Sequence, residues 1–397
     1  MDSRGITLMC RPAVIVGVLL AVAVATKVAA ASERFVPTRP DFVVANVRQA
    51  IPDETLAKLL ERQHAEPSSE AAALELASAF IDRARRLREP RFMGRAEALL
   101  APLASRAHAD AAARRLYADT LQYRHDFAHA IRILDELIRE QPRDADSRLR
   151  RASLHLTRGD FANARSDCAR VASLDGAAAA AGFACLSEVL AGTGQLASAS
   201  AMLEVMGKSQ GALPDDARAY LLSAHAALED RAGRHERAVE IYGEALSRAP
   251  EDDSIRGAMA DVLAQQGDFA RARSIVAVEN PSLTLLVREA AWSSGDRREA
   301  LVRRAHEWLE LESARGDAGH LREAAMLALA SGDAAAALAA ARRNFELQRE
   351  LADVRVLASA SVLAQDDEAQ RALRVWIGDT GFADVVTENI LARRSRG

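Results

Sequence analysis

Apolar side chains recur along most of this chain at spacings of three and four residues. In the stretch that follows Gly159 they are Phe161, Ala164, Cys168 and Val171. This spacing places them on one face of an α-helix. A partner helix is expected over residues 146–158, because a glycine at positive φ ends a helix and the following Asp160 can cap the next one. The pattern therefore predicts a helix–turn–helix unit.

The turn of this unit belongs to a phrase that recurs along the chain. The sequence Gly-Asp-Phe-Ala-x-Ala-Arg occurs at residues 159–165 and again at residues 267–273. The turn residues that align with these copies are His125, Gly159, Gly194, Gly233, Gly267, Gly295, Gly332 and Asp367. Successive turns are separated by 34, 35, 39, 34, 28, 37 and 35 residues. A period near 34 predicts a solenoid in which each unit packs on its neighbours.

One unit carries a pattern that is known from a protein family. From the turn to the end of its second helix, its pattern residues are Gly233, Ala238, Tyr242, Ala245 and Pro250. This order of glycine, small, aromatic, small and proline resembles the tetratricopeptide repeat, and the likeness extends roughly over residues 71–378. The Trp-x-x-Leu-Gly signature of the family's first helix is mostly missing. The resemblance implies an all-α, right-handed α-solenoid of about eight to nine helix–turn–helix repeats.

The N-terminal residues have the order of features that is typical of a secretory signal peptide. Arg4 and Arg11 precede the uncharged apolar stretch 13–26, and the small residues 29–31 follow it. The stretch of 14 residues is shorter than the roughly 20 residues that a spanning helix needs. We therefore expect a periplasmic or secreted protein of the exported bacterial type, with no integral membrane span after cleavage. An uncleaved N-terminal membrane anchor is the alternative.

The chain then divides into four parts. Residues 1–31 form the signal peptide, and residues 32–70 form an extended arm and a capping helix. Residues 71–378 form the solenoid, and residues 379–397 form a C-terminal cap that ends in a basic tail. The positive charges are almost all arginines, which favours a GC-rich bacterial genome as the origin of the bias.

Composition and motifs exclude several classes of function. The net charge of −4 and an aromatic content of 4% argue against a nucleic-acid partner, which requires a basic face and stacking platforms. His125 and His129 stand four residues apart, but no third metal ligand accompanies them. We predict no catalytic residue, no cofactor and no metal, and hence no enzyme.

Two cysteines stand on helices that the solenoid brings together. Cys168 lies on the second helix of one unit and Cys185 on the first helix of the next. In an exported protein they can form a disulfide, which for a 17-residue separation stabilises by about 3 kcal/mol on the loop-entropy model. Two buried free thiols are the alternative.

The resemblance also implies where a partner binds. In the family, the ninth position of each repeat faces a concave groove, and here those positions are Asp119, Ser153, Glu188, Ala227, Asp261, Glu289 and Met326. Four of them are acidic, and Tyr220 and Trp292 lie at neighbouring groove positions. Such a trough suits a peptide or helix with basic and apolar residues. The alternative is that the acidic side chains are only solvated.

We therefore expect a non-catalytic protein–protein interaction scaffold or adaptor in the bacterial cell envelope, which holds one or more envelope proteins. Its candidate partner-binding residues are Asp119, Glu188, Tyr220, Asp261, Glu289 and Trp292. The alternative is a periplasmic module that binds a non-protein ligand such as a glycan, for which the groove supplies two aromatic residues.

Overall fold

The described part of the chain is built entirely from helices. We analysed a computed structural model, which describes residues 54–87, 90–106, 108–209, 215–314 and 320–392. The predicted signal peptide, the arm that precedes residue 54 and the basic tail 393–397 lie outside the described residues. In chain order the helices are α1 (Glu54–Ala65), α2 (Glu70–Leu87), α3 (Pro90–Ala104), α4 (Ala111–Tyr123), α5 (Phe127–Glu140), α6 (Ala145–Thr157), α7 (Phe161–Ala172), α8 (Gly176–Gly192), α9 (Leu196–Ser209), α10 (Asp215–Arg231), α11 (His235–Arg248), α12 (Asp253–Gln265), α13 (Phe269–Val276), α14 (Leu283–Trp292), α15 (Gly295–Ala314), α16 (Leu321–Ser331), α17 (Ala334–Leu347), α18 (Leu351–Leu363), α19 (Asp367–Thr380) and α20 (Val385–Ala392).

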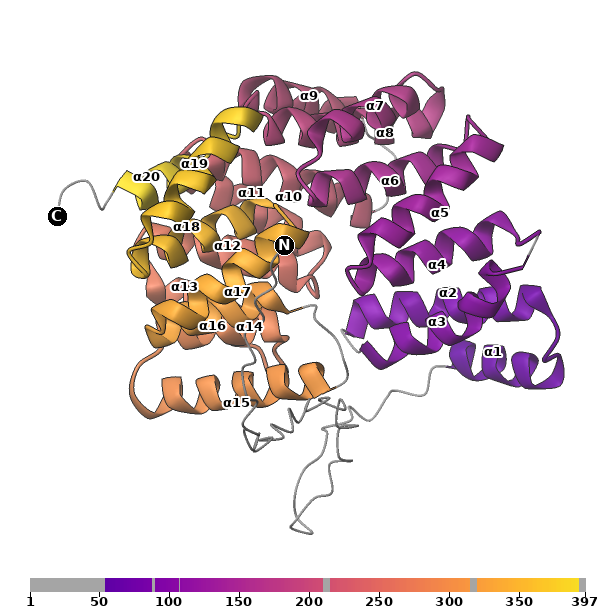
Figure 1. Cartoon of the computed structure of the whole chain (residues 1–397), viewed down its shortest axis with the longest axis horizontal. Helices are drawn as coiled ribbons and strands as arrows, with labels where there is room; N and C mark the ends of the chain where they lie inside the picture. The colour runs from indigo at the N-terminus through magenta and orange to yellow at the C-terminus, as the bar shows by residue number, and fades with distance from the viewer. Residues whose placement is uncertain (1–53, 88–89, 107, 210–214, 315–319, 393–397) are drawn as a thin grey trace, which may run out of the picture. The chain divides into compact units, whose positions relative to one another are not determined.

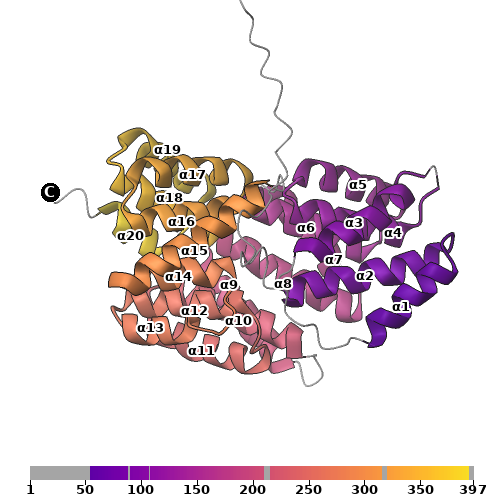
Figure 2. The same cartoon turned by 90° about the horizontal axis from the view of Figure 1, so that it is seen from below.

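The helices form nine successive pairs, from α2–α3 to α18–α19 (Figure 1). The first helix of a pair also packs on the first helix of the next pair, as Figure 2 shows for α12, α14, α16 and α18. Helix α1 packs on α2 at one end, and α20 packs on α18 at the other. This arrangement confirms the expected all-α solenoid of about eight to nine repeats.

Most turns within the pairs contain one residue at positive φ. Gly159 has a φ of 71°, and Asp160 accepts a hydrogen bond from the N–H of Asn163 at the start of α7. This is the geometry expected of the Gly-Asp phrase, because only glycine adopts positive φ at little cost. The turn between α4 and α5 uses His125 in the same conformation, with a φ of 60°.

The last turn lies two residues before its expected position. Gln365, with a φ of 53°, is the residue at positive φ, and Asp366 caps α19 by accepting from the N–H of Ala369. Asp367 is the first residue of the helix. The two adjacent aspartates made the register ambiguous in the sequence, and the capping geometry resolves it.

Small residues allow the helices of a pair to cross closely. Ala152 on α6 and Ala164 on α7 are both fully buried in one apolar cluster. A larger side chain at either position would push the two axes apart. The alanine-rich composition thus serves the packing of neighbouring helices.

The C-terminal helices also contact turns that lie far away in the sequence. The backbone N–H of Arg349 donates to the carbonyl oxygen of Thr157 over 2.7 Å. Arg355 on α18 forms an ion pair with Asp230 at the end of α10, at 2.6 Å. Contacts across such separations are not part of a simple stack, in which each repeat contacts only its neighbours.

Candidate partner-binding face

The six residues predicted to bind a partner all lie on first helices of the pairs. Asp119 is on α4, Glu188 on α8, Tyr220 on α10, Asp261 on α12, and Glu289 and Trp292 are on α14. We call the layer formed by α4, α6, α8, α10, α12, α14, α16 and α18 the first-helix face. The structure separates the six residues into paired charges, packed residues and accessible residues.

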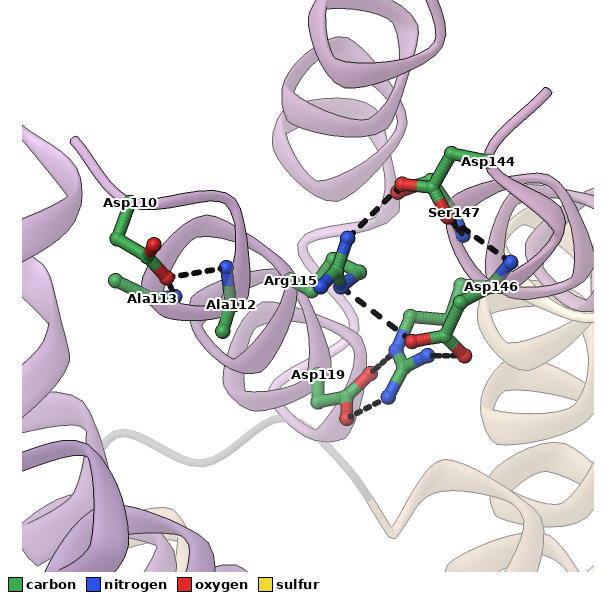
Figure 3. Close-up of polar contacts among 9 residues, drawn as sticks. Asp110, Ala112, Ala113, Arg115, Asp119, Asp144, Asp146 and Ser147 are labelled. Carbon is green, nitrogen blue, oxygen red and sulfur yellow. Dashed lines mark hydrogen bonds and ion pairs between the residues drawn. The ribbon is translucent and has the colours of Figure 1, made fainter. Parts of the chain in front are cut away.

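Asp119 is held in an ion-pair network between α4 and α6 (Figure 3). Its side chain is only 7% exposed and accepts from Nε of Arg150 over 2.9 Å. Arg150 also pairs with Asp146, and Arg115 bridges Asp144 and Asp146 at 2.9 and 3.4 Å. Burial alone would lower the pKa of Arg150, but the carboxylates of Asp119 and Asp146 raise it. The network joins two repeats, and the carboxylate of Asp119 is already engaged in it.

Asp261 on α12, four repeats further along the chain, has the same kind of arrangement. Nε and Nη2 of Arg288 on α14 donate to its two carboxylate oxygens over 2.9 and 2.8 Å. Gly257 makes room for this arginine, since a Cβ there would lie 3.2 Å from its Nε. The sequence therefore provides both the acid and the space for a bidentate pair between adjacent first helices.

Glu289 and Trp292 both interact with neighbouring residues of the solenoid. Glu289 is buried and pairs with Arg297 at the start of α15. The carbonyl oxygen of Trp292 accepts from Nη1 of Arg273 over 2.7 Å, and its ring packs against the cluster around Leu263. The Glu289 carboxylate is thus paired, and the Trp292 ring is partly buried against this cluster.

The pairing continues at positions that the sequence did not single out. Arg322 on α16 donates from Nη2 to Asp353 on α18 over 3.0 Å and to Glu350 over 2.6 Å. Arg355 on α18 binds Asp384 over 2.6 and 3.0 Å. We call these pairs the charge ladder: Asp119–Arg150, Asp261–Arg288, Asp353–Arg322 and Asp384–Arg355. Arginines thus pair with Asp119, Asp261 and Glu289, three of the four acidic groove positions, an arrangement that neither alternative of the sequence analysis foresaw.

Glu188 differs from the other acidic candidates. It forms no ion pair with a residue of the described part of the chain, and its side chain is half-buried. Burial, and then the charge of Glu350 across from it, raise the pKa of Glu188 to about 7. Glu188 therefore exchanges its proton near neutral pH.

Tyr220 is the most accessible aromatic side chain of the face, with 52% of its surface exposed. Phe183 on the neighbouring first helix α8 is 43% exposed. Phe183 was missed in the sequence because α8 is apolar almost throughout, so its periodicity does not show which side faces solvent. The accessible face over α8 and α10 is thus aromatic.

The two cysteines are joined in the structure. Their sulfur atoms lie 1.97 Å apart and their Cα atoms 5.4 Å apart, connecting α7 to α8. Of the two alternatives left open above, the structure contains the disulfide. The bond links two successive repeats.

Two searches of the described residues bear on other kinds of site. No group of three or more His, Cys, Asp or Glu side chains in this part of the chain is arranged to hold a metal ion. No helix among the same residues has the length and apolarity needed to cross a bilayer.

The comparisons with known proteins support the repeat assignment. The family model of the tetratricopeptide repeat matches residues 231–278, which run from the end of α10 to just beyond α13. No curated protein matches the chain.

Three solved structures illustrate the likeness in fold. A tetratricopeptide repeat protein from Parabacteroides merdae is 15% identical, with 70% of this chain and 99% of that one covered and a TM-score of 0.42. A chain of the APC/C hetero-tetramer Cut9–Hcn1 is 13% identical, with 86% and 66% covered and a TM-score of 0.49. The human IFIT1 dimer with PPP-AAAA is 12% identical, with 88% and 96% covered and a TM-score of 0.43.

The assignment rests on three observations of this chain. Its helices form stacked pairs, its turns repeat the glycine and aspartate geometry, and the family model matches one unit in the middle of the stack. Together they show a solenoid of stacked helix pairs that contains a tetratricopeptide repeat over residues 231–278.

Proposed function

We propose that this protein is a non-catalytic scaffold of the bacterial cell envelope that binds a segment of a partner protein on the first-helix face over α8 and α10. The tetratricopeptide repeat fold generally serves protein–protein interaction and carries no chemistry of its own. The single observation behind the choice of surface is the exposure of Tyr220, 52%, on a layer where Asp119, Asp261 and Asp353 are paired with arginines.

The accessible residues define the chemistry of the partner segment. Tyr220 and Phe183 offer aromatic surface, which is enriched at binding hot spots. Glu188 adds one carboxyl group whose charge has no arginine partner among the described residues. A segment with apolar anchors and a single basic residue fits this surface better than a strongly basic segment.

The proposed location in the envelope has two supports. The N-terminal sequence has the features of a signal peptide. Disulfides such as Cys168–Cys185 persist in oxidising compartments and are rare in the bacterial cytosol.

Photocrosslinking in living cells tests the proposed surface. A photoreactive amino acid in place of Tyr220 should capture a discrete partner, and Phe183→Ala should reduce the yield at least fivefold. The matched control is Leu311, an apolar residue on the second helix α15 that is 43% exposed, as Phe183 is. Equal capture from Tyr220 and Leu311 would remove the support for this face.

A glycan-binding module is the second candidate. Of its two aromatic platforms, Trp292 is partly buried against neighbouring helices, which leaves Tyr220 as the more exposed one. Binding of soluble oligosaccharides that depends on Tyr220 would revive this function, and the same purified protein serves for that measurement.

A further inference from the structure

The residues that lead from the end of α19 into the first residue of α20 lie against two turns that are distant in the sequence. These are the turns between α8 and α9 and between α10 and α11. We call residues 381–385, Gly-Phe-Ala-Asp-Val, the clasp segment. A Cβ at Gly194 would lie 2.1 Å from the carbonyl oxygen of Gly381, so only glycine permits this approach. Nε of Arg231 donates to the carbonyl oxygen of Ala383 over 2.9 Å. The segment is therefore held partly through its backbone.

Side chains add to the backbone contacts. The guanidinium of Arg231 lies over the ring of Phe382, with its central carbon 4.4 Å from the ring centroid. This distance is well within the range of a cation–π contact. Further along the segment, a Cβ at Gly233 would lie 3.3 Å from Cγ1 of Val385. We call Gly194, Arg231 and Gly233 the turn-edge site.

Arg231 is incompletely satisfied by the clasp segment. Only 6% of the residue is exposed, and its buried Nη2 has no hydrogen-bond partner among the residues that the structure describes. Burial lowers the pKa of Arg231 to about 10, against the charge of Asp384. Asp384 is the acid of the clasp segment, but its carboxylate is bound to Arg355 and Thr387. The turn-edge site thus retains a buried donor that its present occupant does not use.

Two of these features are those of a peptide-binding site. A main-chain carbonyl accepts from a fixed donor, and an aromatic side chain stacks on a cation. The third, a free guanidinium donor, favours an occupant that brings its own carboxylate. A fixed structural contact would not require an unsatisfied buried donor, which costs free energy in the folded state.

We propose that the turn-edge site is a peptide-binding site that the clasp segment occupies in cis, and that a partner segment displaces it. The partner segment carries an aromatic residue between small residues, followed by a carboxylate that reaches Nη2 of Arg231. This proposal concerns the turns rather than the first-helix face and does not depend on the function proposed above.

A fluorescent peptide with the sequence of residues 380–386, Thr-Gly-Phe-Ala-Asp-Val-Val, provides the probe. In the full-length protein, Phe382→Ala weakens the internal occupant and should bind the peptide at least tenfold more tightly than the wild type. Adding Arg231→Met should abolish that gain, and so should replacing the phenylalanine of the peptide by alanine. Val375→Ala, an exposed apolar change on α19, is the control and should behave as the wild type.

Equal affinity of the wild type and Phe382→Ala would overturn the proposal. If circular dichroism shows that the variant is unfolded, hydrogen exchange of the wild-type protein tests the proposal instead. Saturating peptide should speed exchange of the amides in α20 at least threefold, and unchanged exchange would equally refute the idea. Tyr220→Ala should leave peptide binding intact, so the outcome is separate from that of the crosslinking test.

Discussion

Glu188 illustrates how a single side chain makes stability depend on pH. Its pKa of about 7 in the folded state lies above the ordinary value of 4.5, so the folded state binds the proton more tightly than the unfolded state. The charged carboxylate therefore costs stability at high pH, and this cost fades as the pH falls from about 7 toward 4.5.

We predict that Glu188→Gln raises the melting temperature by roughly 1–2 °C at pH 8, as about 1 kcal/mol would in a chain of 397 residues. The difference should shrink strongly by pH 5, where the native carboxyl is already protonated. Scanning calorimetry at the two pH values checks this. An increase of equal size at both would mean that packing, not charge, is responsible.

Gly194 is constrained by space as well as by its backbone conformation. Gly194→Ala and Gly267→Ala both place a side chain at positive φ, at 75° and 82°, which costs about 1 kcal/mol. A Cβ at Gly194 also collides with Gly381, whereas nothing lies within 4 Å of one at Gly267. We predict a loss of about 1 kcal/mol for Gly267→Ala and at least about 2 kcal/mol for Gly194→Ala in urea unfolding. Equal losses would show that the turn and the clasp segment are not in contact in solution.

At the scale of helices, the charge ladder ties neighbouring repeats together. Asp261→Asn leaves the buried guanidinium of Arg288 without its counter-charge, and we predict a loss of about 2 kcal/mol. Glu240→Gln is the control, because the Arg237–Glu240 pair is exposed on both sides and such pairs contribute at most about 1 kcal/mol. Denaturant unfolding of both variants compares them, and similar losses would contradict the structural role of the ladder.

The disulfide is a second tie between repeats, from α7 to α8. Cys168→Ala should cost about 3 kcal/mol in the oxidised protein, from the entropy of the loop that the bond closes. Under reducing conditions the wild type should lose most of this advantage. Thiol alkylation without reductant tests directly whether the disulfide is present. If both cysteines react in the folded protein, the bond is absent.

What the sequence predicts at this scale depends on how local the signal is. The glycine and aspartate of each turn determine the backbone conformation and helix capping only a few residues away. The helix pairs can therefore be predicted directly from the repeating sequence. The arginine partners of Asp119 and Asp261 stand 31 and 27 residues later. With arginines spread over most helices, no local pattern selects which one crosses to the next repeat. The acidic groove positions were therefore recognised, but their pairing was not.

At the scale of the whole described chain, Arg355 connects α18 to both Asp384 and Asp230. A stack with contacts only between neighbours unfolds approximately as a one-dimensional array of units. A long-range pair makes distant units unfold together. The 34-residue period carries no information about this link, because it describes only what each repeat shares with the next.

We predict that Arg355→Met broadens the urea transition or divides it into two steps. The reason is that two buried carboxylates lose their common partner, and the middle and C-terminal repeats no longer support each other. Fluorescence of Trp376 and far-UV circular dichroism should then give different midpoints. Coincident transitions in this variant would indicate that neighbour contacts alone make unfolding cooperative.

The close approach of Gly194 to Gly381 also bears on how such a chain can change in length. In an open array a unit can be duplicated or deleted, since both new neighbours present equivalent surfaces. Here an added unit between α11 and α16 would carry the clasp segment past the turns that it now meets. The number of intervening repeats is thus constrained by this contact, whereas duplication of a repeat before α6 would leave these contacts unchanged.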